Sequence, residues 1–136
     1  MARIVLTDVQ VLINTSTDIS SFVSSITLNS TVNEVQTTAM GNTAITRVGG
    51  LLDNSVTIEF YQDFATSQLE SIIYPLIGTV TPMRIKPTTS ATSATNPQYQ
   101  FSALVSEWSP ISGAVGELST ASATWPISGT ITKTTA

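Results

Sequence analysis

Apolar and polar residues alternate along several short stretches of the chain, which is the pattern of strands that bury one face of a sheet. The alternation is clearest where Val56, Ile58 and Phe60 are separated by polar residues. The same pattern predicts further strands at residues 5–13, 26–32, 80–86, 99–108 and 118–132. Pro82 places its strand on a sheet edge or at a bulge, because proline has no N–H for a ladder hydrogen bond.

One stretch instead has the periodicity of a helix. Its apolar residues recur at intervals of three and four, so they form one stripe on the helix surface. The stripe consists of Leu69, Ile72, Ile73 and Leu76. Ser67 and Glu70 have the spacing of a capping box, which predicts that the helix begins after Ser67. Pro75 limits the helix or kinks its last turn, so we expect one short helix that packs on the sheets.

The strand expected at residues 26–32 has two unlike faces. One face is apolar and the other is short, neutral and polar. The apolar face is formed by Ile26, Leu28 and Val32, and the polar face by Thr27, Asn29, Thr31 and Asn33. The alternation then changes phase, because Val35 is apolar and Glu34 is charged. This slip predicts a bulge or the end of the strand near residues 33–35.

Two stretches lack a regular pattern. Residues 36–53 contain Gly41, Gly49 and Gly50, and we expect a long irregular loop there, with residues 43–48 able to form an arm or hairpin against a partner. Loops of this length in a compact domain are usually functional or disordered. Residues 88–96 are rich in serine, threonine and alanine, which predicts a surface loop without apolar anchors.

The chain carries few charges for its size. Its 136 residues fit one domain, and 10% of them are charged, against about 25% in ordinary soluble domains. Large permanent interfaces are depleted of charge because an unpaired buried charge is strongly destabilising. The low charge therefore favours a chain whose surface is largely covered by other copies. The alternative is an ordinary secreted β protein with a face rich in serine and threonine.

Composition excludes several kinds of site. The sequence has no cysteine and no histidine, which removes disulfides, thiolate metal sites and nucleophiles that depend on a histidine base. A glycine motif for phosphates and a metal-ligand spacing are also missing. The net charge of −4 and five scattered basic residues argue against tight phosphate binding. No apolar run is long enough to span a bilayer. We expect no catalysis, no cofactor, no metal and no membrane insertion.

The two tryptophans differ in phase. Trp125 alternates in step with Ala121 and Ala123, which predicts that it packs in the core. Trp108 is out of phase with the apolar residues that precede it, which favours a place at an interface.

Several short motifs follow one another along the chain in a characteristic order. They are D-I-S-S-F-V-S-S-I-T-L at 18–28, E-V-Q-T-T-A-M-G at 34–41, G-L-L-D-N-S-V-T-I-E-F-Y-Q-D-F-A at 50–65, W-S-P-I-S-G-A-V-G-E at 108–117 and W-P-I-S-G-T-I-T at 125–132. In this order they resemble the tail-tube (major tail) proteins of long-tailed bacteriophages. The resemblance covers residues 18–133 and depends on the order and spacing of the pieces.

The resemblance implies a mainly β fold with two packed antiparallel sheets, sandwich-like or barrel-like, and one short flanking α-helix. Residues 1–136 would form a single tail-tube domain with an assembly loop at about 36–53 and without the C-terminal immunoglobulin-like domain of some relatives. The implied function is that of a structural virion protein. Its copies would form stacked rings, six to a ring, and DNA would pass through the tube during ejection without specific binding.

Partners and location follow from the same resemblance. The implied partners are further copies of the chain and the tape-measure, tail-terminator and distal-tail proteins. The implied location is the virion tail, with assembly in the host cytoplasm. Two alternatives stay open. One is the inner tube of a contractile injection or type VI-like secretion device. The other is a carbohydrate-binding virion β-sandwich that uses Trp108 and the loop at residues 88–96.

Two sets of residues are candidates for assembly. A lumen wall should be polar and acidic, since like charge repels DNA phosphates. The lumen candidates are Glu34, Glu59, Glu107, Glu117, Thr27, Asn29, Thr31 and Asn33. The long loop would join stacked rings, as the equivalent loop does in the resembling family. Its candidates are Met40, Gly41, Thr43, Ile45, Arg47, Gly49 and Gly50.

Overall fold

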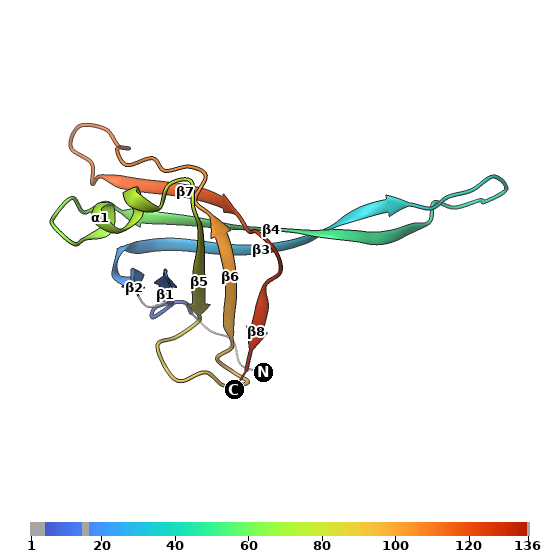
Figure 1. Ribbon diagram of the computed structural model, residues 1–136, viewed down its shortest axis with the longest axis horizontal. Helices are drawn as coiled ribbons and strands as arrows, with labels where there is room; N and C mark the ends of the chain where they lie inside the picture. Colours follow the sequence, from blue (N-terminus) through green and yellow to red (C-terminus); the bar gives the residue numbers. More distant parts are fainter. Residues whose placement is uncertain (1–4, 15–16, 136) are drawn as a thin grey trace.

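The computed structural model describes residues 5–14 and 17–135. Strands dominate these residues, and one short helix interrupts them (Figure 1). The elements are β1 (Gln10–Ile13), β2 (Thr17–Asp18), a 3-10 turn η1 (Ser20–Phe22), β3 (Val23–Gln36), β4 (Arg47–Tyr61), α1 (Leu69–Ile73), a 3-10 turn η2 (Tyr74–Leu76), β5 (Val80–Lys86), β6 (Gln98–Leu104), β7 (Thr120–Pro126) and β8 (Thr132–Thr134).

The strands form two antiparallel sheets. The five-stranded sheet has the order β2-β1-β5-β6-β8, and the three-stranded sheet has the order β3-β4-β7. One apolar core lies between them. The expected pair of packed sheets with a short flanking helix is confirmed. The barrel-like variant is not observed, because the sheets remain separate in the described part of the chain.

The core is formed by the residues whose alternation predicted it. Val56, Ile58 and Phe60 of β4 are fully buried. Trp125 of β7 is also fully buried, as its phase predicted, and its ring nitrogen donates to the Glu107 carbonyl at 2.8 Å. The opposite sheet contributes Val11, Ile13, Met83, Phe101 and Ala103.

Three strands are shorter than the sequence pattern predicted. The first begins at Gln10, and Val5 is 81% exposed. The strand expected at 99–108 ends at Leu104. The stretch 118–132 is divided into β7 and β8 by a turn in which Gly129 has a φ of +102°. Apolar residues in phase with each strand extend beyond its end, as Val9 before β1, Val105 after β6 and Ile127 after β7 do, so periodicity alone could not place the strand ends.

Pro82 was expected at a sheet edge or a bulge, but its strand β5 lies between β1 and β6 in the middle of the sheet, and neither pairing has a register shift. The reason is local. The last pairing of β1 with β5 joins Ile13 to Met83, and Asn14 then donates its N–H to the Pro82 carbonyl at 2.8 Å. The nitrogen of Pro82 therefore faces the end of β1 and not β6, so the proline removes no hydrogen bond between β5 and β6.

The helix begins later than the capping box predicted. Its N-cap is Gln68, which makes no side-chain cap hydrogen bond, and Ser67 has a φ of +64°. The Glu70 N–H donates to the Asp63 carbonyl at 3.2 Å, so the preceding loop satisfies it. The apolar stripe is confirmed, since Leu69 and Ile73 are buried and the other two members pack against the core.

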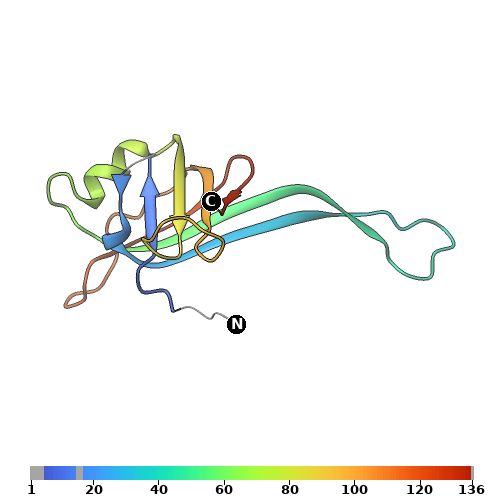
Figure 2. The same cartoon turned by 90° about the horizontal axis from the view of Figure 1, so that it is seen from below.

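The largest departure concerns the segment expected to be an irregular loop at 36–53. Residues 47–53 belong to β4, which pairs with β3 in a hairpin, so the connection spans only residues 37–46. The expected bulge is confirmed as a register shift between Val32 and Glu34. Figures 1 and 2 show this hairpin projecting far beyond the two packed sheets. We call its residues 32–52 the arm.

The loop at residues 88–96 has a polar anchor that the sequence analysis missed. Asn96 is only 6% exposed. Its amide nitrogen donates to the carbonyls of Ser90 at 2.8 Å and Ala91 at 3.2 Å, and its side-chain oxygen accepts the Thr88 N–H at 3.1 Å. One buried amide thus orders the loop in place of an apolar side chain.

Candidate assembly surfaces

The outer face of the three-stranded sheet is a row of short polar side chains. Successive side chains of a strand point to opposite faces of the sheet, so these strands bury their apolar residues in the core and turn their polar residues outward. Register places Thr27, Thr57 and Thr124 side by side on β3, β4 and β7, and the last two hydroxyls lie 3.2 Å apart. We call this surface the polar wall. Its members are Thr27, Asn29, Thr31, Thr57, Glu59, Ser122 and Thr124.

The structure brings some of the predicted lumen residues together on this wall and separates others. Glu59 lies on the wall, in register with Ser25 on one side and Ser122 on the other. Glu107 lies beside it, where its carboxylate accepts the Thr124 N–H at 2.8 Å. Glu117 lies in the loop before β7 and does not share this face.

Glu34 lies on the opposite face of the hairpin. It is paired with Gly49, and a Cβ placed on Gly49 would lie 3.4 Å from Cγ2 of Val32, a member of the apolar face. A Cβ on Gly50 would instead lie 3.7 Å from that of Asn33. Asn33 therefore continues the face of the polar wall onto the arm, whereas Glu34 does not.

The predicted inter-ring residues lie in two different parts of the arm, the connection and strand β4. Met40, Gly41, Thr43 and Ile45 lie in the connection at residues 37–46, whereas Arg47, Gly49 and Gly50 lie in β4. At the base of the connection, Thr37 donates its N–H to the Thr46 carbonyl at 2.8 Å. Arg47 Nε lies 3.4 Å from the Glu34 carboxylate.

The arm also exposes apolar side chains that a free chain would normally bury. Met40 and Leu51 are 101% and 81% exposed. Further exposed apolar residues on the arm are Val32, Val35, Ile45, Val48 and Leu52. Val32 and Val35 lie on opposite faces of the hairpin, because a Cβ on Gly49 would meet Val32 and one on Gly50 would meet Val35. Exposed apolar side chains are concentrated on the arm, which makes it a candidate surface for contact with a partner.

The two edges of the three-stranded sheet differ. β3 pairs only with β4, so its other edge is open along 14 residues of the described chain. The free edge of β7 is partly covered. There the Ser112 carbonyl accepts the Thr120 N–H at 3.1 Å, and Glu107 accepts that of Thr124. A long open edge is a site for pairing with another chain.

The fold matches solved structures, although no protein-family model and no curated protein matches the sequence. A chain of the native gene transfer agent virion matches with a TM-score of 0.70 and 11% identity, over 91% of this chain and 95% of that one. A chain of the empty gene transfer agent tail, refined with C6 symmetry, gives 0.65 and 12%, over 91% and 95%. A chain of the six-fold symmetrised anti-feeding prophage baseplate gives 0.56 and 13%, over 98% and 97%.

The chain has the fold of subunits of phage-tail-like particles. The resemblance found in the sequence is therefore confirmed at the level of the fold. The match covers nearly the whole chain in each case.

Trp108 is tied into this tail-particle fold and is not free to anchor an interface as its phase suggested. Its ring packs edge-on against Phe60 with centroids 5.5 Å apart. Its ring nitrogen donates to the Glu70 carboxylate at 2.9 Å, and the Gln62 amide donates to the same carboxylate at 3.1 Å. The spacing of Ser67 and Glu70 indicated a capping box, and this network has no sequence signal because its members come from three separate segments.

Among residues 5–14 and 17–135, no group of three or more acidic side chains is placed to hold a metal ion. The described helix is too short to cross a membrane.

Proposed function

We propose that this chain is a tail-tube subunit, a structural virion protein whose copies form stacked rings of six around a channel that DNA traverses during ejection. The observation that carries the proposal is the shared fold across 91–98% of the chain with subunits of tail particles, two of which were treated with six-fold symmetry. Tape-measure, tail-terminator and distal-tail proteins would be the partners at the ends of such a tube.

The open β3 edge supports closure into a ring. Each copy offers two edges of one sheet, β3 and β7, which lie on opposite sides of β4. Contact between unlike edges of neighbouring copies is heterologous, and such contacts generate a ring when the rotation closes. Ring closure would cover the 14-residue edge that a single chain leaves unpaired.

The polar wall supports a channel for DNA. If neighbouring three-stranded sheets join, their outer faces form one continuous surface of hydroxyl and amide groups with Glu59 from every copy. Its members include neither lysine nor arginine. A wall of neutral and acidic groups does not bind phosphates, so DNA would slide along it.

The arm supports the stacking of rings. It extends along the strand direction, away from the packed sheets (Figure 1), and exposes Met40 and Leu51 almost completely. Copies joined side by side through sheet edges would leave the arms free to reach the next ring.

A second candidate is the inner tube of a contractile injection device. The likeness to a chain of the anti-feeding prophage baseplate, over 98% of this chain, favours it. The two candidates predict the same tube and differ in what surrounds it. Co-expression with the proteins encoded beside this chain separates them, because a contractile sheath would assemble around the tube only in the second case.

Truncation of the arm tests the proposal. Residues 38–45 are replaced by Asn-Gly, which closes the hairpin between Thr37 and Thr46 with a two-residue turn. Electron microscopy should show tubes for the unaltered protein and unstacked rings for the truncated one. Long tubes from the truncated protein would contradict the role of the arm, and the absence of rings from both would contradict the proposed function.

A further inference from the structure

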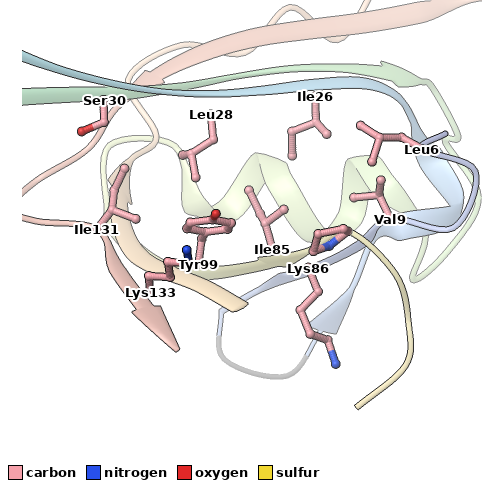
Figure 3. A pocket seen from close by; sticks show the side chains of 11 residues that line it. Leu6, Val9, Ile26, Leu28, Ser30, Ile85, Lys86, Tyr99, Ile131 and Lys133 are labelled. Carbon is pink, nitrogen blue, oxygen red and sulfur yellow. The ribbon is translucent and has the colours of Figure 1, made fainter. Parts of the chain in front are cut away.

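An apolar groove of about 500 Å³ lies between the two sheets, below the open edge of β3. Figure 3 shows Ile26 and Leu28 of β3 on one side and Ile85 and Tyr99 of the five-stranded sheet on the other. Ile131 closes one end. All but Ile85 of these side chains are only partly buried, so the core is left open here. Exposed apolar side chains gathered in a groove of this kind are typical of a site that another apolar segment covers.

The two lysines of the chain line this groove in different ways. Lys86 and Lys133 belong to its lining, on the side of the five-stranded sheet (Figure 3). Lys86 follows the buried Ile85 on β5, and its side chain extends away from the groove to donate to the Ser90 carbonyl at 3.0 Å. Lys133 is paired with Tyr99 and lies on the groove side. The groove is therefore apolar inside and cationic at its rim, and it fits an apolar segment that carries a carboxylate.

Residues 110–118, which we call the apolar loop, have this character. Ile111, Val115 and Leu118 are 83%, 105% and 66% exposed. Glu117 lies among them, and its carboxylate accepts the Ala114 N–H of the same loop at 3.4 Å, with no basic side chain beside it in the described part of the chain. The sequence has no lysine or arginine between Lys86 and Lys133, so no cation of the loop competes for this carboxylate.

The loop and the groove lie at opposite edges of the same sheet. The segment that leads into the loop runs beside the free edge of β7, where Glu107 accepts the Thr124 N–H. Thr124, Thr57 and Thr27 form one cross-strand row, and the neighbours of Thr27 on β3, Ile26 and Leu28, line the groove. This row crosses the sheet from β7 to β3, so the apolar loop lies on the β7 side and the groove lies below the β3 edge.

We infer that the apolar loop of one copy seats in the groove of the adjacent copy in the ring, with Glu117 beside Lys133 of that copy. The inference rests on the proposed ring. Joining the β7 side of one copy to the β3 edge of another brings an exposed acidic apolar segment to an open cationic apolar groove. The arm is another exposed apolar segment, but it extends along the strands and not across them (Figures 1 and 2).

Cross-linking tests the contact directly, because the sequence has no cysteine. Glu117→Cys and Lys133→Cys proteins are prepared separately and joined with a short bis-maleimide. A heterologous contact predicts covalent dimers in the mixture of the two variants and not in either variant alone. Glu59→Cys, mixed with Lys133→Cys, is the matched control and should give no dimer, because Glu59 lies on the polar wall.

Charge reversal provides a second test at exposed positions that do not hold the fold together. Glu117→Lys and Lys133→Glu should each raise the protein concentration needed for ring assembly several-fold, and their combination should restore assembly. Val115→Asp should prevent ring assembly while the far-ultraviolet circular dichroism stays unchanged, since this side chain is fully exposed.

The outcomes separate the two proposals. If the unaltered protein forms rings while the Glu117/Lys133 mixture gives no dimer, the seating of the apolar loop is wrong and the ring stands. Dimers between Met40→Cys and Lys133→Cys, in place of Glu117→Cys and Lys133→Cys, would show that the arm occupies the groove and would also overturn the inference. If the unaltered protein forms neither rings nor cross-linked dimers, both proposals fail.

Discussion

The indole nitrogen of Trp108 donates a hydrogen bond of 2.9 Å to the carboxylate of Glu70. This contact joins the segment after β6 to helix α1, across 38 residues of sequence. Gln62 donates to the same carboxylate and to the Pro110 carbonyl at 2.8 Å. The Glu70 carboxylate therefore accepts from both Trp108 and Gln62, and Gln62 in turn holds Pro110 at the base of the apolar loop.

Glu70→Ala should destabilise the fold by about 1–3 kcal/mol, because the Trp108 and Gln62 donors lose a charged acceptor in a partly buried site. Urea unfolding, followed by tryptophan fluorescence, measures the change. Asp8→Ala is the matched control and should change stability by less than about 0.5 kcal/mol, because its carboxylate lies at an exposed site. Equal effects of the two substitutions would contradict the proposed role of Glu70.

Asn54 should be the most sensitive polar position in the sandwich. Its side chain is 1% exposed, accepts the Ser30 hydroxyl at 2.7 Å and donates to the Gly129 carbonyl at 3.2 Å. Asn54→Ala should lower the free energy of unfolding by about 1–3 kcal/mol, since two partners lose their hydrogen bond. Asn29→Ala, on the exposed polar wall, is the control. A smaller loss of unfolding free energy for Asn54→Ala than for Asn29→Ala would show that the hydrogen bonds of the buried Asn54 amide do not stabilise the sandwich.

The two adjacent glycines of the arm should respond differently to the same substitution. A Cβ on Gly50 would lie 3.1 Å from the backbone oxygen of Asn33, whereas a Cβ on Gly49 would contact only Val32, at 3.4 Å. Gly50→Ala should therefore loosen strand pairing in the arm, and Gly49→Ala should not. Amide hydrogen exchange of residues 32–52 is the measurement. Equal exchange in both variants would contradict the close approach at Gly50.

A cation on the polar wall should convert the assembled channel into a surface that retains DNA. Glu59→Lys replaces the wall's carboxylate in every copy, so assembled rings should bind DNA in a filter assay, and binding should weaken steeply as salt increases. Asp8→Lys makes the same change in charge away from the wall and is the control. Equal DNA binding by the two variants would argue against the wall as the channel surface.

Periodicity predicted most of the core. The alternation of Val56, Ile58 and Phe60 and the phase of Trp125 placed these side chains correctly, because burial of one sheet face is a local, period-two signal. The bulge between Val32 and Glu34 was also visible as a change of phase. These features depend on neighbours in sequence.

The features that the sequence did not reveal depend on neighbours in space. Gly49 and Gly50 indicated an irregular loop, whereas they lie in β4, where a Cβ on Gly50 would crowd Asn33 of β3. Trp108 was assigned to an interface because its partner Glu70 is 38 residues away. Asn96 has no special pattern around it, yet its amide organises a whole loop.

The sequence indicated which residue types should form the assembly surfaces, but not which of those residues lie on the same surface. A polar strand face at Thr27, Asn29 and Thr31 was evident from alternation, and register then added Glu59 to it. Glu34 had the right chemistry for the same wall, but it follows Val32 by two residues on β3 and therefore lies on the opposite, apolar face. The register shift acts on β4, where it places Gly49 on the same face as Leu52 although the two are three residues apart. A single sequence does not state how a register shift redirects the side chains beyond it.

Cryo-electron microscopy of the purified protein at increasing concentration tests the account most directly. The account predicts annular particles with six copies around an open channel, and a reconstruction in which Thr27, Thr57 and Glu59 line that channel. Single chains that remain monodisperse at every concentration, or rings whose channel is lined by the five-stranded sheet, would contradict it.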